Sequence, residues 1–186
     1  MIDTSNEIAG DGDIPHPCVG YARRMMVKSL NQQASVMIEC VQNHTPSVMV
    51  IDEIGRAPEV EAARTCKQRG VRMVASAHGD LRKLVKNKHL RGLIGGIQTV
   101  TLSDGAAKAE AKKNNTETLN KLKAERGGEP VFDTIIELSR GRHNDWSIIH
   151  NSAHAVDAIL DMQQYEVECR SRDPKTGNFS VSKEMK

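Results

Sequence analysis

Apolar residues in the first hundred positions form short runs that predict strands. The run SVMVID at 47–52 is continuous, which is typical of a parallel strand covered on both faces. Further strands are predicted at 71–79 (VRMVASAHG) and 96–104 (GIQTVTLSD), and residues 1–4 resemble the last step of a strand. Each of these segments runs from apolar residues into a polar end.

Helical spacing of apolar residues separates these runs. Residues 30–44 predict a helix, and residues 57–69 predict a second, with Pro58 near its start and Gly70 just past its end. Two short helical turns are predicted within 80–95. The apolar face of the first helix is formed by Ala34, Met37, Ile38 and Val41.

The alternation of strands and helices from 30 to 104 predicts an α/β fold with an open, mainly parallel sheet and flanking helices. Ligands of such sheets bind outside the carboxyl ends of the strands. The residues at those ends are polar: Asp3, the pair Asp52–Glu53, and Ser76 to His78. We therefore expect a binding site where these three groups meet.

The second half of the chain is more polar. Residues 106–128 predict a solvated, flexible insertion; a basic arm that contacts nucleic acid is the alternative for this segment. A β-hairpin is predicted from 130–140 and 145–151, followed by a helix at 152–160. Residues 1–160 are expected to form the core domain, and 161–186 a polar, loose tail.

Composition narrows the functional classes. The chain has 186 residues, a net charge of +2 and 3% aromatic residues, so we expect neither a strong polyanion partner nor a stacking platform for single-stranded nucleic acid. The four cysteines are widely spaced, which favours a reducing compartment such as cytoplasm or plastid over a zinc cluster or a disulfide framework. The first residues, MIDTSNEIAGDGD, do not match a signal or transit peptide, and no apolar run predicts a membrane span.

The two acids that follow the apolar run at 47–51 are the clearest candidates for catalytic residues. In P-loop ATPases, an acid at a strand end orders the shell of Mg²⁺, and a neighbouring Glu orients the attacking water. Asp52 and Glu53 have this arrangement. The alternative is that an apolar run ends in two acids by chance, and that Glu53 is an ordinary acid of the first helical turn.

Other polar residues could serve the same site. His78 could contact a γ-phosphate or the attacking water, or it could cap the helix that begins near Asp80. Arg23 and Arg24 are candidates for a charge-stabilising finger, which can act in trans, or they form a solvated basic turn.

A longer set of segments resembles one family. DTSNEIAGDGDIPHP, ARRM, VMVIDEIG, EAARTCKQRGV, SAHG and LIGGIQTVTLSD occur in an order that resembles the RecA-like P-loop ATPases related to stage III sporulation protein AA and to a conserved plastid open reading frame. The resemblance covers roughly residues 1–160.

The resemblance implies ATP and Mg²⁺ as cofactors and a ring as the assembled state. It identifies Asp52 and Glu53 with the Walker B acids, with Asp52 holding Mg²⁺ through water, and His78 with a histidine box. It also makes Glu7, in the acidic segment after Asp3, a second candidate for water activation.

The chain departs from that family because it contains no Gly-Lys pair, and hence no phosphate loop. Four lost charge-assisted hydrogen bonds would remove about 6 kcal/mol of ATP affinity. We therefore expect a partial ATPase core, inactive or weak by itself. Two alternatives are a non-catalytic module that docks on a complete ATPase ring, and a nucleic-acid binder that uses Arg23, Arg24 and the arm at 108–126.

Overall fold

The computed structural model describes residues 1–113 and 120–186. The chain divides into two compact units, Met1–Ile94 and Gly95–Lys186. This boundary differs from the expected one after residue 160. Part of the basic arm expected at 108–126 falls within 114–119 and lies outside the described residues.

The first unit contains a parallel sheet with the order β2–β1–β3–β4. Its strands are β1 (Ile2–Asp3), β2 (Met25–Met26), β3 (Val48–Glu53) and β4 (Arg72–Ser76). The predicted α/β class with flanking helices is therefore confirmed. β2 was not predicted, because two residues beside a basic turn carry no readable period.

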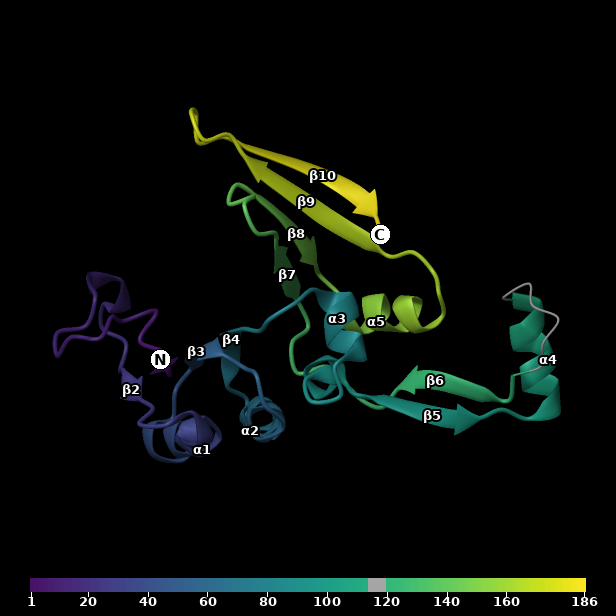
Figure 1. The fold of residues 1–186 in the computed structure, drawn as a ribbon, viewed down its shortest axis with the longest axis horizontal. Coiled ribbons are helices and arrows are strands. Elements are labelled where there is room, and N and C mark those ends of the chain that lie inside the picture. Colours follow the sequence, from purple (N-terminus) through teal and green to yellow (C-terminus); the bar gives the residue numbers. More distant parts are fainter. Residues whose placement is uncertain (114–119) are drawn as a thin grey trace. The chain divides into compact units, whose positions relative to one another are not determined.

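Helices α1 (Gln33–His44) and α2 (Ala57–Gln68) lie side by side on one face of this sheet (Figure 1). Met37 and Val41 of α1 are buried as predicted, whereas Ala34 and Ile38 are only half-buried. Burying such side chains is the main stabilising term for a small unit. The unit's core is completed by Ile2, Cys40, Met49, Ile51, Ile54, Val60, Ala63 and Cys66.

Short helical turns complete the first unit. The predicted start of the first helix is a 3₁₀ turn, η2 (Leu30–Gln32), that leads into α1. The two turns expected within 80–95 are α3 (Leu81–Lys86) and η3 (Arg91–Ile94), and another 3₁₀ turn, η1 (Pro17–Val19), lies in the acidic loop after β1.

The second unit begins with an antiparallel ribbon that corrects one prediction. β5 (Ile97–Thr101) pairs with β6 (Leu122–Arg126) and does not extend the parallel sheet. Gly95 and Gly96, with φ of +98° and +71°, turn the chain just before β5. β5 can stand outside the parallel sheet because Gln98, Thr99 and Thr101 are exposed polar residues that need no cover. α4 (Asp104–Lys113) lies between the two strands in sequence.

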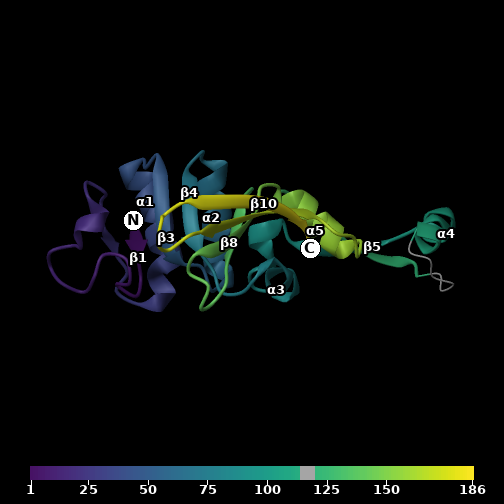
Figure 2. The ribbon, with the colours of Figure 1, turned by 90° about the horizontal axis from the view of Figure 1, so that it is seen from above.

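The rest of the second unit is an antiparallel sheet with the order β10–β9–β8–β7. The predicted hairpin is confirmed as β7 (Ile135–Leu138) and β8 (Asp145–Ile149), followed by α5 (Ser152–Leu160). Residues 161–186 contain β9 (Glu166–Arg172) and β10 (Phe179–Met185) where a loose tail was expected. Figure 2 shows this long hairpin in yellow. In the described part of the chain, no helix has the length and apolar character needed to cross a membrane.

Candidate functional site

The carboxyl ends of β1, β3 and β4 meet at one edge of the parallel sheet. Ile2 pairs with Ile51 and Glu53 pairs with Ser76, so the polar residues that follow these strands are neighbours. Asp3, Asp52 and Glu53 therefore lie at the same edge as the segment that contains His78. This is the convergence that the sequence pattern predicted.

A β-bulge shapes the end of β3. The pairing register with β4 shifts between Ile51 and Glu53, which leaves Asp52 as the extra residue. The hydroxyl of Ser76 donates a hydrogen bond to the carbonyl oxygen of Asp52, and the amide of Ile54 donates to the carbonyl oxygen of Ser76 at 2.8 Å. Bulges of this kind re-aim side chains next to functional sites.

Glu53 and His78 form a direct contact across the two strand ends. The distance from Glu53 Oε1 to His78 Nε2 is 3.4 Å, and the side chains are 46% and 91% exposed. An exposed pair of this kind adds little to stability. The contact instead leaves both groups accessible to a ligand, within hydrogen-bonding reach of each other.

The loop after β1 folds back on the acidic edge. Asp3 is buried, and its two carboxylate oxygens accept the amides of Glu7 at 3.1 Å and Ala9 at 2.8 Å. Asp52 Oδ2 accepts the amide of Ser5 at 3.3 Å. Asp3 therefore anchors the loop, while the side chain of Glu7 is exposed.

Arg24 holds the same loop from its other side. Its guanidinium donates to Asn6 Oδ1 at 2.7 Å, to the carbonyl oxygen of Gly10 at 2.6 Å and to that of Gly12 at 3.2 Å. Its buried Nε has no hydrogen-bond partner among the described residues. Arg24 thus fixes the conformation of the segment that carries Glu7.

Arg23 is not brought together with the acids. It precedes β2, so it lies towards the amino edge of the sheet, and its Nη1 is 3.4 Å from Nδ1 of His44 at the end of α1. Its carbonyl oxygen accepts a hydrogen bond from the terminal amine of Met1 at 2.6 Å. Within the chain, Arg23 and Arg24 therefore have separate surroundings.

Gln33 is a residue of this site that the sequence pattern did not identify. It is 3% exposed, its Oε1 accepts a hydrogen bond from Thr4 Oγ1 at 2.9 Å, and its Nε2 donates to the carbonyl oxygen of Glu53. The available signal was a polar residue one turn before Met37 on the apolar face of the helix. Gln33 links the loop after β1 to the end of β3.

A second buried polar residue fixes the turn after β3. Glu59 is 4% exposed, and its Oε2 accepts the amides of Gly55 at 2.8 Å and Arg56 at 3.0 Å. This capping arrangement starts α2 and satisfies amides that the helix leaves free. It sets the path of the chain directly after the candidate acids.

The two carboxylates at the end of β3 fit a hard cation. Mg²⁺ prefers oxygen ligands, keeps several waters, and is usually held by one or two carboxylates together with substrate phosphates. Asp52 and Glu53 supply such oxygens on adjacent residues. No group of three or more His, Cys, Asp or Glu side chains suited to a metal is found in residues 1–113 and 120–186.

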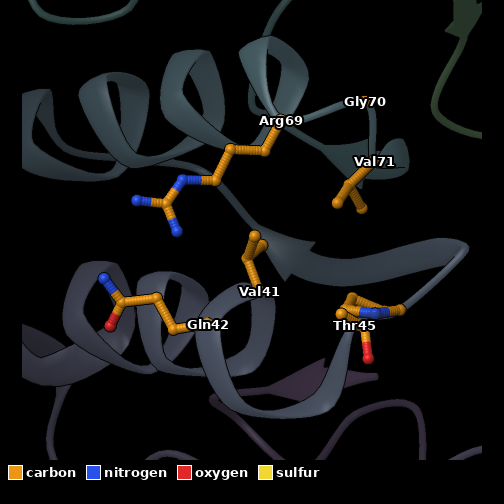
Figure 3. A pocket seen from close by; sticks show the side chains of 7 residues that line it. Val41, Gln42, Thr45, Arg69, Gly70 and Val71 are labelled. Carbon is orange, nitrogen blue, oxygen red and sulfur yellow. The ribbon is translucent and has the colours of Figure 1, made fainter.

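A hollow of about 400 Å³ lies away from these acids (Figure 3). It opens between the ends of α1 and α2, at the amino ends of β3 and β4, which is the opposite edge of the sheet. The candidate acids therefore do not line it. The residues around it are Val41, Gln42, Thr45, Pro46, Arg69, Gly70 and Val71.

Comparison with known proteins identifies relatives by sequence. The chain is 48% identical over 171 residues to the uncharacterized protein ycf45 of Porphyra purpurea, which covers 91% of this chain and 29% of that protein. It is 49% identical over 171 residues to Protein SEEDLING PLASTID DEVELOPMENT 1 of Arabidopsis thaliana, covering 91% of this chain and 24% of that protein. No protein-family model matches, and no solved structure gives a significant match.

A more distant relative agrees with the expected family. Stage III sporulation protein AA of Bacillus subtilis is 32% identical over 96 residues, which cover 50% of this chain and 30% of that protein. The chain is thus homologous to the ycf45 proteins and to stage III sporulation protein AA, and it spans about a quarter of the first two relatives' lengths. The resemblance drawn from the sequence motifs is confirmed.

Proposed function

We propose, from this homology and from the acidic edge of the parallel sheet, that the chain is part of an ATP-binding and ATP-hydrolysing P-loop ATPase core. The observation that carries the proposal is the meeting of Asp52, Glu53 and His78 at one edge, with Glu53 and His78 3.4 Å apart. Ligands of open α/β sheets bind at this edge.

Each residue has a proposed task. Glu53 orients the attacking water and accepts its proton, and His78 holds the Glu53 carboxylate in place or contacts the γ-phosphate. Asp52 holds Mg²⁺ through a water molecule, and this ion supplies charge stabilisation at the phosphates when it is bound. The bulge at Asp52 interrupts the regular pairing between β3 and β4 at this acid, while Glu53 stays paired with Ser76.

The loop after β1 supplies the remaining candidates. Asp3 contributes to nucleotide binding by anchoring the loop through the amides of Glu7 and Ala9. Glu7 is exposed and is a second candidate for water activation. Arg24 supports the loop. Arg23 is the better candidate for a finger, because its guanidinium is exposed beside His44 and could act on a neighbouring subunit of a ring.

The phosphate loop is the part of the site that these 186 residues do not contain. It would come from a segment outside them, and the 186 residues by themselves would bind ATP weakly or not at all. Removal of four charge-assisted hydrogen bonds corresponds to about four decades of affinity.

The test joins these residues to their natural phosphate-loop segment and measures ATP binding and hydrolysis. Glu53→Gln should leave ATP affinity within about threefold and lower kcat by roughly 10²–10⁴-fold, because it removes the general base and keeps the shape. Glu39→Gln, an exposed position on α1, is the matched control and should change neither quantity.

Two results would contradict the proposal. ATP that fails to bind when the phosphate loop is present would remove the ATPase assignment and leave the non-catalytic docking module as the explanation. Unchanged hydrolysis in Glu53→Gln would remove Glu53 from the mechanism, and the same measurement on Glu7→Gln would then decide whether the second candidate is the base.

A further inference from the structure

One face of the antiparallel sheet in the second unit carries an aromatic and cationic cluster. Directly paired residues of a sheet point to the same side. Trp146 of β8 pairs with Arg170 of β9, Arg172 pairs with Phe179 of β10, and Arg170 and Arg172 are two residues apart on one strand. These four side chains, which we call the aromatic–arginine cluster, therefore share one face.

The two rings of the cluster lie close together, with Phe179 exposed and Trp146 half-buried. The centroids of Trp146 and Phe179 are 5.8 Å apart at an interplanar angle of 72°, and Phe179 is 60% exposed. The guanidinium carbon of Arg172 lies 6.0 Å from the centre of the Phe179 ring. A flat ring with a cation above its face is a surface on which a base can stack.

The loops beside the cluster add unneutralised positive charge. The β7–β8 and β9–β10 loops adjoin at this end of the sheet, where the amide of Arg172 donates to the carbonyl oxygen of Asn144 at 2.7 Å. Four cations lie at this end of the sheet, and none of them forms an ion pair with an acid in the described part of the chain. They are Arg140, Arg142, Arg172 and Lys175.

Two acids, Asp145 and Asp173, lie at this end and hold hydrogen bonds from neutral donors. Asp145 Oδ1 accepts the hydroxyl of Ser171 at 2.5 Å, and Asp173 Oδ1 accepts the amide of Lys175 at 2.8 Å. At the other end of the same face, by contrast, the charges are paired: Glu166 with Lys183 at 2.9 Å, and Glu168 with both His150 and Arg170. At the end with the rings, the four cations that form no ion pair with a described residue outnumber Asp145 and Asp173, so this end carries an excess of positive charge.

We propose that the aromatic–arginine cluster binds a single strand of nucleic acid. A base stacks on the exposed face of Phe179 or the edge of Trp146, and the neighbouring phosphates contact Arg172 and the cations of the two loops. The surface belongs wholly to the second unit, and it uses none of the residues assigned to ATP hydrolysis. It also differs from Arg23, Arg24 and the arm at 108–126.

The same face also exposes apolar side chains, so a protein is the alternative partner for this surface. Leu138 is 78% exposed and Val181 is 60% exposed. A protein interface core is depleted of charge, however, whereas this surface combines rings with Arg172 and the cations of the two loops, which form no ion pair with a described residue. The charge thus favours a polyanion.

The low aromatic content of the sequence predicted no stacking platform for single-stranded nucleic acid. Pairing across β8, β9 and β10, however, brings together the chain's one tryptophan and one of its two phenylalanines.

The single tryptophan gives a direct assay on the full 186-residue chain. Titration with a twelve-nucleotide single strand should quench the fluorescence of Trp146, because a base comes into contact with the indole or its neighbour. Affinity should fall with salt, with a slope of log K against log salt of about −2 to −3 for three or four neutralised phosphates. A duplex of the same length should compete at least tenfold more weakly.

Variants separate stacking from charge. Phe179→Leu keeps an apolar side chain but removes the ring, and it should weaken binding roughly 5- to 100-fold with little change in the salt slope. Arg172→Ala should weaken binding and also reduce the magnitude of the slope by about 0.7. Lys88→Ala, an exposed cation of the first unit, is the matched control and should leave both unchanged.

Three outcomes would overturn the proposal. They are no binding at low salt, binding in which duplex and single strand compete equally, and binding that Phe179→Leu and Arg172→Ala both leave intact. Light scattering on the same samples tests for the alternative, a protein partner. A dimer that Phe179→Leu dissociates, together with no affinity for the oligonucleotide, would assign the face to a second copy of the chain.

Discussion

The side-chain amide of Gln33 donates a hydrogen bond to the backbone carbonyl oxygen of Glu53, while its own oxygen accepts one from Thr4. One buried residue of α1 therefore ties together the ends of β1 and β3. The positions of Asp52 and Glu53 depend on a side chain that belongs to neither strand.

Replacing Gln33 by Ala should destabilise the first unit by about 1–3 kcal/mol, because a buried carbonyl group loses its donor. Hydrogen exchange of the amides in β3, together with urea unfolding followed by circular dichroism, measures this loss. Gln42→Ala is the control, because Gln42 lies on the exposed side of the same helix. Equal stability of the two variants would show that the Gln33 bridge contributes nothing.

The sequence predicted the elements whose side chains repeat with a clear period. The apolar run of β3, the Pro58 and Gly70 boundaries of α2 and the hairpin of β7 and β8 are all present in the structure. β6 was missed, because its sequence LKAER has no strand-like pattern. This segment becomes a strand through its pairing with β5. β9 and β10 alternate, but so many of their residues are charged that the segment resembled a tail.

The candidate site was predictable to a similar extent. Acids that follow apolar runs are visible in a sequence, and parallel pairing explains why they meet. The bulge at Asp52 and the Gln33 bridge were not predictable, because both depend on contacts between residues more than 19 positions apart. The anchoring role of Asp3 was not predictable either, because it depends on the loop folding back so that the amide of Ala9 reaches its carboxylate.

Gly95 should tolerate no side chain. Its φ is +98°, and a Cβ atom would lie 2.3 Å from the carbonyl oxygen of Gly128. We expect Gly95→Ala to cost the second unit roughly 2–4 kcal/mol, through backbone strain and overpacking. Thermal unfolding followed by Trp146 fluorescence reports this unit.

Gly105 provides the matched comparison. A Cβ atom there would meet no atom within 4 Å, and the residue lies in α4. Gly105→Ala should therefore raise the same transition slightly, by up to about 1 kcal/mol, because Ala favours the helix. If both variants shift the midpoint of thermal unfolding in the same direction, the close approach of Gly95 to the carbonyl oxygen of Gly128 is contradicted.

The buried thiols should make the first unit sensitive to alkaline pH. Burial raises the pKa of Cys66 and of Cys40 above the ordinary thiol value. Above about pH 8.5 the unfolded chain loses these protons while the folded chain keeps them, so the free energy of unfolding falls as pH rises towards the raised pKa values. The slope should reach at most about 1.4 kcal/mol per pH unit for each thiol.

Urea unfolding between pH 8 and pH 9.5 measures that slope. The double variant Cys40→Ala/Cys66→Ala should be less stable at pH 8, because it loses buried volume, but its stability should change less with pH. Cys18→Ser should retain the original slope, because Cys18 is exposed. If the double variant kept the full slope of unfolding free energy against pH, groups other than these two thiols would cause the alkaline sensitivity.

The order of strands in the parallel sheet has a consequence for synthesis of the protein. β1 lies between β2 and β3, and Ile2 pairs with Ile51. During translation, β1 must therefore wait for about 50 further residues to leave the ribosome before β3 can pair with it, which takes roughly 2–10 s. Until then Ile2 and Asp3 lack the strand β3 beside them, so these two buried residues reach their final surroundings only after the chain has been made through Ile51.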